Sequence, residues 1–304
     1  MLKYMNLRIL LLIVILFVGV ATFALAEEVT SNTTTNAAGD SGVQQQLQGF
    51  NLNGYNNTGQ KTWQVNGDKA DITDEKIKIT NVDAKFYGKE NGNLTSKTGT
   101  IDKVNGKVHL QDDVVITADR GTKMTTDSLD WNRNKNLITT NDPVKITDDQ
   151  GVVTGQGMTA HSDLKQASIN KNVKAVINTS SGGDGDGDGS PDEQKVTITC
   201  DGPMTMDQVK MHATFRDNVV AVEQSTGREL YADKMDVWFD EDQKAISKVI
   251  CKGHVKAVQG GNATYAEEMV YTGDDELLVM TGRPKIVFDT GSAKGSGMFK
   301  SLGK

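Results

Sequence analysis

Residues 127–146 read DSLDWNRNKNLITTNDPVKI, and this stretch decides the fold. Leu129 and Trp131 alternate with a polar residue, and so do Val144 and Ile146. Successive side chains of a strand point to opposite faces, so the alternation predicts two strands, each with one apolar and one polar face. The run between them, residues 132–136, is rich in Asn, which tolerates tight turns. The stretch is therefore predicted to be a β-hairpin.

About a hundred residues later the same pattern returns. Residues 233–258 read DKMDVWFDEDQKAISKVICKGHVKAV, and LQDDVVI (110–116) has its counterpart in FRDNVVA (215–221). The segments 152–176 and 262–287 also correspond. Strand-like segments in the same order in both halves are typical of an internal repeat. Both halves are therefore predicted to share one fold.

Composition favours an all-β protein with two domains. The 304 residues include 37% hydrophobic and 6% aromatic residues, with 31 Gly and only 4 Pro. A chain of this length suffices for two ordinary domains. Strands with one apolar face bury it against one another, so we expect two tandem domains that are each a folded-over sheet or β-jelly roll with an apolar interior.

The segment 1–26 is predicted to direct export. Lys3 and Arg8 precede the uncharged run from Ile9 to Ala26, and Ala-Leu-Ala closes it before two Glu. The Ala-x-Ala ending favours a cleaved signal peptide, whereas the strongly apolar run favours a single-span anchor to the inner membrane through residues 9–26. Both alternatives place the body of the protein outside the inner membrane.

Two polar segments separate the predicted parts of the chain. Residues 27–46 lack an apolar pattern and are predicted to be a flexible tether. Residues 179–195 are rich in Gly and Asp and are predicted to be a linker between a domain at 47–178 and a second at 196–304. Asp184, Asp186 and Asp188 resemble the start of a calcium loop, but the position of its bidentate Glu is Lys195, which favours a linker.

Charge, cysteines and motifs narrow the function. The formal net charge of −7 argues against nucleic acid as a partner. Cys200 and Cys251 occupy similar phrases, ITCDGPM and VICKGHV, and are either a disulfide or two separate buried thiols. We expect no metal site, because no Cys or His pair has ligand spacing. We expect no cofactor and no catalytic residues, because the four His are scattered and the motifs of nucleophile elbows and phosphate loops are missing. GQGMTA (155–160) lacks the βαβ context of a dinucleotide site.

At this point the chain resembles a known family. Residues 49–72 (GFNLNGYNNTGQKTWQVNGDKADI), together with VDAKFYG, VHLQDDVVI and GVVTGQGMTA, resemble the periplasmic LptC family of the lipopolysaccharide export machine. FRDNVVAV, LYADKMDVWF, KGHVKAV and LLVMTGRPKIV resemble the LptA or OstA-like domain of the same system. The resemblance covers residues 47–288 and implies open β-jelly rolls that shelter lipid acyl chains and join edge to edge.

The resemblance and the strand phase together predict the lining of a lipid groove. Trp63, Trp131 and Trp238 each fit either a groove or an ordinary core, because phase separates inside from outside but not groove from core. The predicted lining residues are Val114, Ile116, Leu129, Trp131, Val144, Ile146, Val173, Ala175, Phe215, Val219, Met235, Val237, Phe239, Val255, Ala257, Ile286 and Phe288.

Unpaired strand edges are the predicted docking surfaces, because an edge adds another strand by main-chain hydrogen bonds. One edge would be the last strand of the first domain, one the first strand of the second, and one the outer end of the chain. The residues are Val173, Lys174, Ala175, Val176, Val196, Thr197, Ile198, Lys285, Ile286 and Val287.

The sequence therefore predicts a periplasmic carrier of lipopolysaccharide, not an enzyme. Its partners would be the lipid A acyl chains, an inner-membrane ABC transporter, and an LptA-like module or outer-membrane receiver, with head-to-tail self-association as a further option. The alternative is a structural β-repeat scaffold or adhesin of the envelope without a lipid groove. A β-solenoid enzyme acting on polysaccharide would need a carboxylate cluster that the sequence does not reveal.

Overall fold

The structure is a computed structural model. It describes residues 45–88, 91–118, 121–148, 151–161, 165–179, 194–207, 209–239, 246–273 and 277–288. The predicted signal peptide or anchor and nearly all of the predicted tether and linker lie outside these residues. Within them, no helix is long and apolar enough to cross a membrane.

The described chain forms seventeen strands and one short 3-10 turn, η2 (Arg133–Lys135). The strands of the first half are β1 (Gln45–Tyr55), β2 (Lys61–Ile72), β3 (Lys76–Phe86), β4 (Gly92–Asp102), β5 (Lys107–Ala118), β6 (Lys123–Asn132), β7 (Leu137–Asp148), β8 (Gly151–His161) and β9 (Gln166–Thr179). Those of the second half are β10 (Gln194–Cys200), β11 (Met204–Asp207), β12 (His212–Glu223), β13 (Arg228–Phe239), β14 (Ile246–Gln259), β15 (Asn262–Thr272), β16 (Leu277–Thr281) and β17 (Lys285–Val287).

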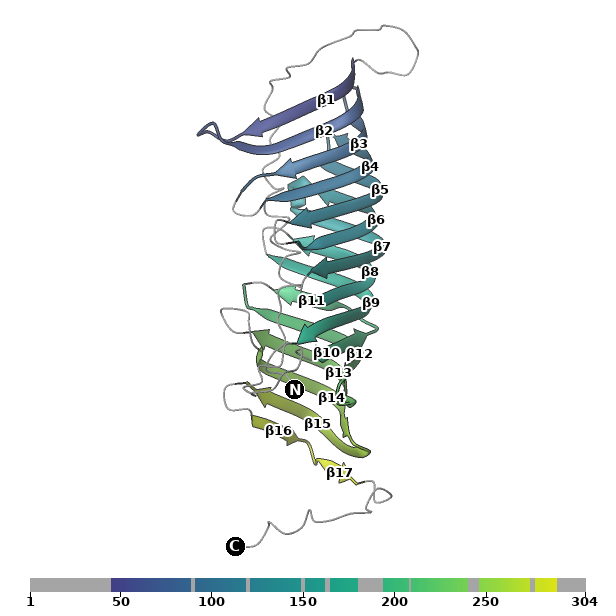
Figure 1. The fold of residues 1–304 in the computed structure, drawn as a ribbon, viewed down its shortest axis with the longest axis vertical. Coiled ribbons are helices and arrows are strands. Elements are labelled where there is room, and N and C mark those ends of the chain that lie inside the picture. Colours follow the sequence, from purple (N-terminus) through teal and green to yellow (C-terminus); the bar gives the residue numbers. More distant parts are fainter. Residues whose placement is uncertain are drawn as a thin grey trace, which may run out of the picture.

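Most strands pair antiparallel with the next strand in the chain, so the sheet is a long meander; the exceptions are β10 and β11, which lie between β9 and β12, and β16 and β17, which both pair with β15. The pairings run from β1–β2 through β8–β9, and again from β12–β13 to β14–β15. Figure 1 shows the strands stacked in chain order along the long axis of the molecule. The predicted hairpin at 127–146 is β6, η2 and β7, whose turn contains Asn136 in the left-handed region. The all-β prediction of tandem open jelly rolls is confirmed.

The two halves form one continuous sheet. β9 pairs with both β10 and β11, and these two short strands both pair with β12 on their other side. Residues 201–203 break what would otherwise be a single long strand between β9 and β12. The predicted linker therefore separates two modules in sequence, while main-chain hydrogen bonds join them in space.

Bulges near the middle of the long strands divide the sheet into two walls. The ladder shifts register at neighbouring places in β5–β6, β7–β8, β8–β9, β12–β13 and β14–β15. Residues there adopt positive φ, among them Asp112, Asn172, Asp217 and His254. A bulge bends its strand, and aligned bulges bend the whole sheet along one line. The apolar side chains of both walls face the concave side.

A buried Val follows the bulge in six strands, about one in every second strand of the meander. The bulge residue and the Val after it recur together, for example as Asn172-Val173 and Asn218-Val219. This repeat of about two strands is shorter than the half-chain repeat that is evident in the sequence. The Val starts the second wall of each strand and points inward. These residues are Val82, Val114, Val144, Val173, Val219 and Val255.

Candidate functional site

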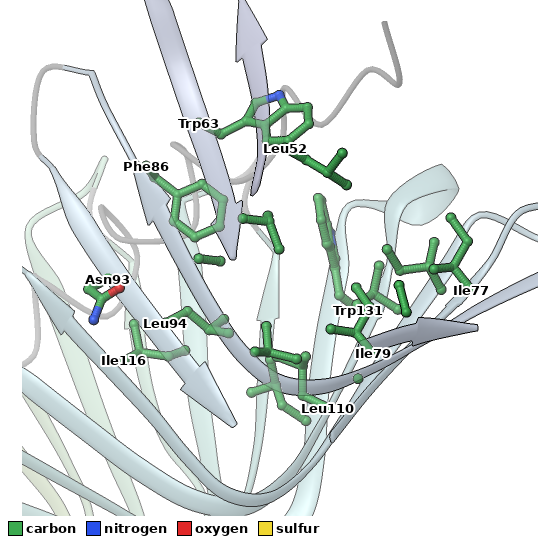
Figure 2. Close-up of a pocket in the computed structure, with 18 of the residues that line it drawn as sticks. Leu52, Trp63, Ile77, Ile79, Phe86, Asn93, Leu94, Leu110, Ile116 and Trp131 are labelled. Atoms are coloured by element: carbon green, nitrogen blue, oxygen red, sulfur yellow. The ribbon is translucent and has the colours of Figure 1, made fainter. Parts of the chain in front are cut away.

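An apolar cavity lies between the two walls at the β1 end of the sheet. Figure 2 shows its side chains pointing into the concave side of the curved strands. The lining residues lie on β1 to β7, at the positions whose side chains point inward. They are Leu47, Phe50, Leu52, Trp63, Val65, Ala70, Ile72, Ile77, Ile79, Val82, Ala84, Phe86, Gly92, Asn93, Leu94, Gly99, Ile101, Val108, Leu110, Ile116, Leu129, Trp131 and Ile138.

Two glycines shape this end of the sheet. A β-carbon on Gly67 would lie 2.6 Å from the Phe50 ring, and one on Gly54 would lie 2.0 Å from the Trp63 ring. The aromatic rings therefore pack directly against the glycine backbone, at a distance that a larger residue would not permit. This packing keeps two large apolar surfaces at the end of the cavity without filling it.

The chemistry of the lining suits hydrocarbon. Asn93 supplies the single carboxamide among the lining residues, and no lining residue is charged. The Asn93 Oδ1 atom is buried without a hydrogen-bond partner. Apolar surface drives binding by its removal from water, so a site of this kind selects alkyl chains over polar ligands.

The cavity is small for a lipid. Its volume is about 120 Å³, comparable to the engineered cavity of roughly 150 Å³ that stays dry and binds benzene. The space in this structure therefore holds a short piece of one alkyl chain. Binding of a longer alkyl chain requires the two walls to separate or their side chains to move.

Beyond β7 the interior is closed by its own side chains. Ile146, Val153, Val237 and Val249 are each 0% exposed, whereas lining residues of the cavity such as Phe50 and Phe86 retain 8%. The expectation of a continuous open groove is therefore not met in this structure. Space between the walls opens toward β1, while the C-terminal module is packed like an ordinary core.

The predicted lining residues divide accordingly. Ile116, Leu129 and Trp131 line the cavity. Ala257 is partly buried against the core. The next group faces inward but lies in closed packing: Val114, Val144, Ile146, Val173, Ala175, Phe215, Val219, Met235, Val237, Phe239 and Val255.

Ile286 and Phe288 do not line the interior. They are 57% and 66% exposed, because among the described residues the short β17 pairs with β15 alone and no opposite wall covers it. The placement of these two residues in a groove is wrong for this structure. Leu277, Leu278 and Val279 of β16 are exposed beside the same edge.

The predicted inner docking edges meet each other within the chain. Val173, Ala175 and Val176 of β9 pair with Cys200, Ile198 and Thr197 of β10, and Lys174 and Val196 lie in the same ladder. The predicted outer edge, Lys285 to Val287, is β17 and pairs on one side with β15. At the other end of the sheet, β1 pairs with β2.

The three tryptophans lie in two different environments. Trp63 and Trp131 line the cavity. Trp238 lies on the polar face, where the His212 ring stacks on it at a centroid distance of 4.4 Å. The Lys248 Nζ atom lies 5.8 Å from the centroid of the Trp238 ring. Trp238 is thus part of the outer surface of the C-terminal module.

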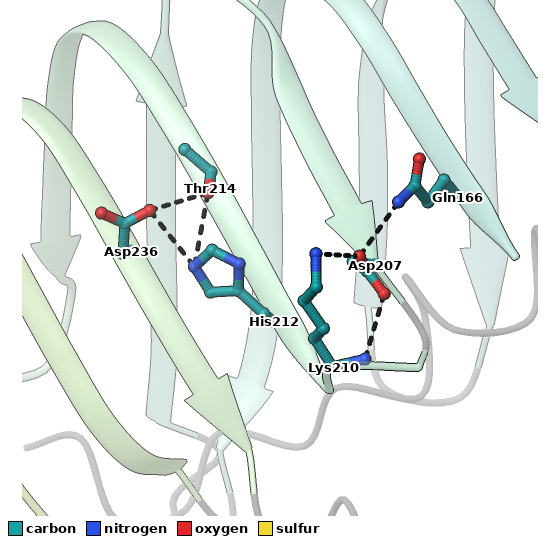
Figure 3. Close-up of polar contacts among 6 residues, drawn as sticks. All are labelled: Gln166, Asp207, Lys210, His212, Thr214 and Asp236. Atoms are coloured by element: carbon teal, nitrogen blue, oxygen red, sulfur yellow. Dashed lines mark hydrogen bonds and ion pairs between the residues drawn. The ribbon is translucent and has the colours of Figure 1, made fainter. Parts of the chain in front are cut away.

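Polar contacts on that outer face help to join the modules. Figure 3 shows Gln166 of β9 donating from Nε2 to Asp207 of β11, at 3.0 Å. The backbone amide of Lys210 also donates to Asp207 Oδ1, and the Lys210 Nζ atom lies 3.1 Å from Asp207 Oδ2. Burial raises the pKa of Asp207, but these hydrogen bonds outweigh it and hold that pKa below its ordinary value.

A buried carboxylate, Asp236, lies on the same outer face. Asp236 accepts a hydrogen bond of 2.7 Å from the Thr214 hydroxyl, and the His212 Nε2 atom lies 3.2 Å from the same oxygen. Lys234 forms an ion pair with its other oxygen. Burial raises the pKa of Asp236, but Lys234 and Thr214 outweigh it and hold that pKa below the ordinary value. The cluster lies on the polar face of β12 and β13 and fastens these strands.

The two cysteines are free, buried thiols, so the disulfide interpretation is wrong and the separate-thiol alternative holds. Cys200 lies in β10 and Cys251 in β14, with β12 and β13 between them. Three strand spacings of about 4.8 Å exceed the roughly 7 Å that a disulfide spans. The similar sequences around Cys200 and Cys251 instead reflect equivalent inward positions beside the bend. The Cys200 Sγ donates there to the Gly202 carbonyl, as the Ser96 hydroxyl donates to Thr98.

We predict that neither thiol reacts in the folded protein at neutral pH. Burial raises the pKa of Cys200 to about 11 and that of Cys251 to about 12, so the reactive thiolate is scarce. Titration with a thiol reagent should detect both only after unfolding, and a reductant should leave the melting temperature unchanged. Finding no free thiol in the unfolded, unreduced chain would contradict this result.

The fold and the cavity define the class: an all-β protein of two tandem open jelly rolls with an apolar interior. The family model described as "Lipopolysaccharide-assembly, LptC-related" matches residues 11–178, more than half of the chain. A second model, "LptA/(LptD N-terminal domain) LPS transport protein", matches residues 197–301. The chain therefore belongs to the LptC-related family of lipopolysaccharide assembly, with an LptA-like domain in its second half.

The chain was also compared with solved structures and with curated proteins. A solved structure of LptH from Pseudomonas aeruginosa, titled an LptA homologous periplasmic component of the lipopolysaccharide transport device, is 11% identical. The match covers 56% of this chain and 96% of that one, with a TM-score of 0.29. No curated protein matches the chain. Proteins of the two matched families are transport components of the periplasm.

Proposed function

We propose that the protein is a segment of the lipopolysaccharide path across the periplasm. The acyl chains would lie between the two walls and the sugars outside them. An inner-membrane ABC transporter would supply the energy and the outer membrane would be the destination, so the protein itself needs no catalytic group. The apolar cavity at the β1 end is the observation that carries this proposal.

The energetics explain why such a path is needed. Exposing an alkyl chain to water costs ~0.8 kcal/mol per methylene, or roughly 10 kcal/mol for a chain of about twelve carbons. A lipid with several chains therefore crosses an aqueous compartment only when it is sheltered. The lining of Leu, Ile, Val, Phe and Trp side chains offers that shelter at the end of the sheet that follows the export segment.

The proposed division of the chain follows the same logic. Residues 47–178 would be the LptC-like module that receives lipid, and residues 196–304 the LptA-like module that passes it on. The ladder between β9 and β10 makes their junction within one chain, so no separate partner is needed there. The exposed β16 and β17 edge would meet a further LptA-like module, an outer-membrane receiver or a second copy. Residues 9–26 would be a signal peptide or a tether.

One observation favours the competing function of an envelope scaffold. The interior from β8 to β14 is closed by its own buried side chains, as in a protein that fills its own core. A scaffold would bind no lipid at either end. The two proposals therefore differ most clearly at the cavity, where only the transport path requires contact with acyl chains.

Photo-crosslinking in cells tests the transport proposal. A photoreactive amino acid at Ile79, which lines the cavity, should capture lipopolysaccharide. The matched control carries the photoreactive amino acid at the adjacent Lys78, which is exposed on the polar face, and should not capture lipopolysaccharide. Capture at Ile79 alone supports the path. Equal capture at both positions, or none at either, would reject it in favour of the scaffold.

A further inference from the structure

A row rich in methionine runs along the closed interior, from β8 at the end of the first module through the C-terminal module. Its members are successive Cα partners on neighbouring strands from β8 to β16, so they form one line across the sheet. The methionine row consists of five methionines, Met158, Met204, Met235, Met269 and Met280, with Ile169, Phe215 and Cys251 between them.

The row lies inside the sheet and leaves no open path. Met204 and Met235 are 1% exposed and Met269 is 2% exposed. Only Met280, at the β16 edge, is partly buried rather than buried. These side chains occupy the position between the walls that a lipid would need.

The same line continues into the cavity. Ala70, Ile79, Gly99, Leu110 and Leu129 are also successive Cα partners, from β2 to β6, and all five line the cavity. Between the two parts, Thr140 of β7 is the partner of Met158. One inner row therefore passes from open space lined by Ala, Gly, Ile and Leu to closed packing rich in Met.

Methionine differs from these residues in one property that matters here. Its side chain is unbranched, has three rotatable bonds and a polarisable sulfur, and adapts its shape to irregular surfaces. Branched residues such as Val and Ile are restricted at χ1 and cannot make way as easily. Because five of its eight members are Met, this row closes the interior while leaving it able to open by side-chain rotation.

We propose that the methionine row is the closed form of the acyl-chain path in the C-terminal module. A saturated alkyl chain advancing from the cavity would take the place of the Met side chains, which rotate toward the walls and become its lining. The row would close again behind the chain and keep water out. This inference rests on the proposed transport function and names the residues that carry it in the second half.

A nitroxide-labelled stearic acid tests the inference on the full chain. The nitroxide quenches tryptophan fluorescence and broadens nearby methyl signals in NMR spectra of protein labelled with 13C-methyl methionine. Trp63 and Trp131 report on the cavity once the outer Trp238 is replaced by Phe (W238F). Met124, the partner of Ile116, reports from beside the cavity, and Met235 reports from the row.

The reporters are far enough apart to be separated. From β6 to β13 the sheet advances six strands, about 29 Å at roughly 4.8 Å per strand. A probe that stays in the cavity therefore broadens Met124 and leaves Met235 sharp. We expect quenching and the broadening of both methionines.

Each other outcome has a distinct meaning. Quenching with a sharp Met235 signal would overturn the methionine-row inference and leave the transport proposal standing. No quenching at all would reject the cavity as an alkyl-chain site, and the proposed function with it. In the variant Met204→Leu with Met269→Leu, we expect loss of the Met235 broadening but unchanged quenching. Broadening that persists in this variant would show that chain entry does not depend on the flexible side chains.

Discussion

Replacing Ile198 by Asp is expected to split the thermal unfolding of the protein into two transitions. Ile198 is 2% exposed and faces inward in β10, where its partner in β9 is Ala175, with 0% exposure. An uncompensated buried charge costs about 3 to 5 kcal/mol. Because this ladder joins the two modules, the cost falls on their junction. Wild-type protein should melt in one calorimetric transition, since its sheet is continuous.

The adjacent Thr199 provides the matched control. It alternates to the polar face of the same strand, and its partner in β9 is the exposed Lys174. An opposite-charge cross-strand pair contributes roughly 0.2 to 1 kcal/mol, so Thr199→Asp should leave a single transition and about the same melting temperature. Two transitions in the wild-type protein would show that the modules unfold independently and that the ladder does not couple them.

The repeat and the strand phase were sufficient to predict the fold. Alternation at Leu129 and Trp131 marks the inward face of β6, and the inward assignment of Val173 and Val237 is correct for the same reason. The pairing of 173–176 with 196–198 was anticipated as a pair of edges, because one strand ends the first module and the other begins the second. Local patterns determine these features.

The location of the cavity could not be predicted in the same way. Phase gives the face of each residue, but the distance between the two walls depends on side chains that meet only in the folded sheet. Most of the lining comes from β1 to β4, which have no counterpart in the repeat that was detected. The alternation in Trp63-Gln-Val65 and Ile77-Lys-Ile79 was the available signal for those strands.

The cysteines illustrate a different limit. Similar phrases around Cys200 and Cys251 suggested proximity, but in a repeat protein similarity marks equivalent positions rather than contact. Both residues occupy a place beside the bend where a small side chain fits. The first module has Ser96 and Thr126 at comparable places, each donating to a carbonyl two residues further on. The sequence therefore revealed the position in the repeat and not the partner.

Enlarging one alanine in each half should change stability in opposite directions. Ala84 lines the cavity, so the added carbons of Ala84→Leu enter empty space. Filling a cavity typically stabilises a protein by about 0.5 to 2 kcal/mol. Ala175 lies instead between Val153 and Ile198, which are themselves fully packed, and neither can rotate away easily. Ala175→Leu should therefore destabilise the protein by about 1 to 3 kcal/mol.

Binding separates the two variants further, because the same substitution removes the space that a lipid needs. Ala84→Leu should weaken binding of the nitroxide-labelled stearic acid by about tenfold, which corresponds to ~1.4 kcal/mol, while it raises the midpoint of urea unfolding. Stability and binding thus move in opposite directions at Ala84, as expected for a site kept empty for a ligand. Equal destabilisation by both variants would show instead that the walls near β3 are packed as tightly as those near β9.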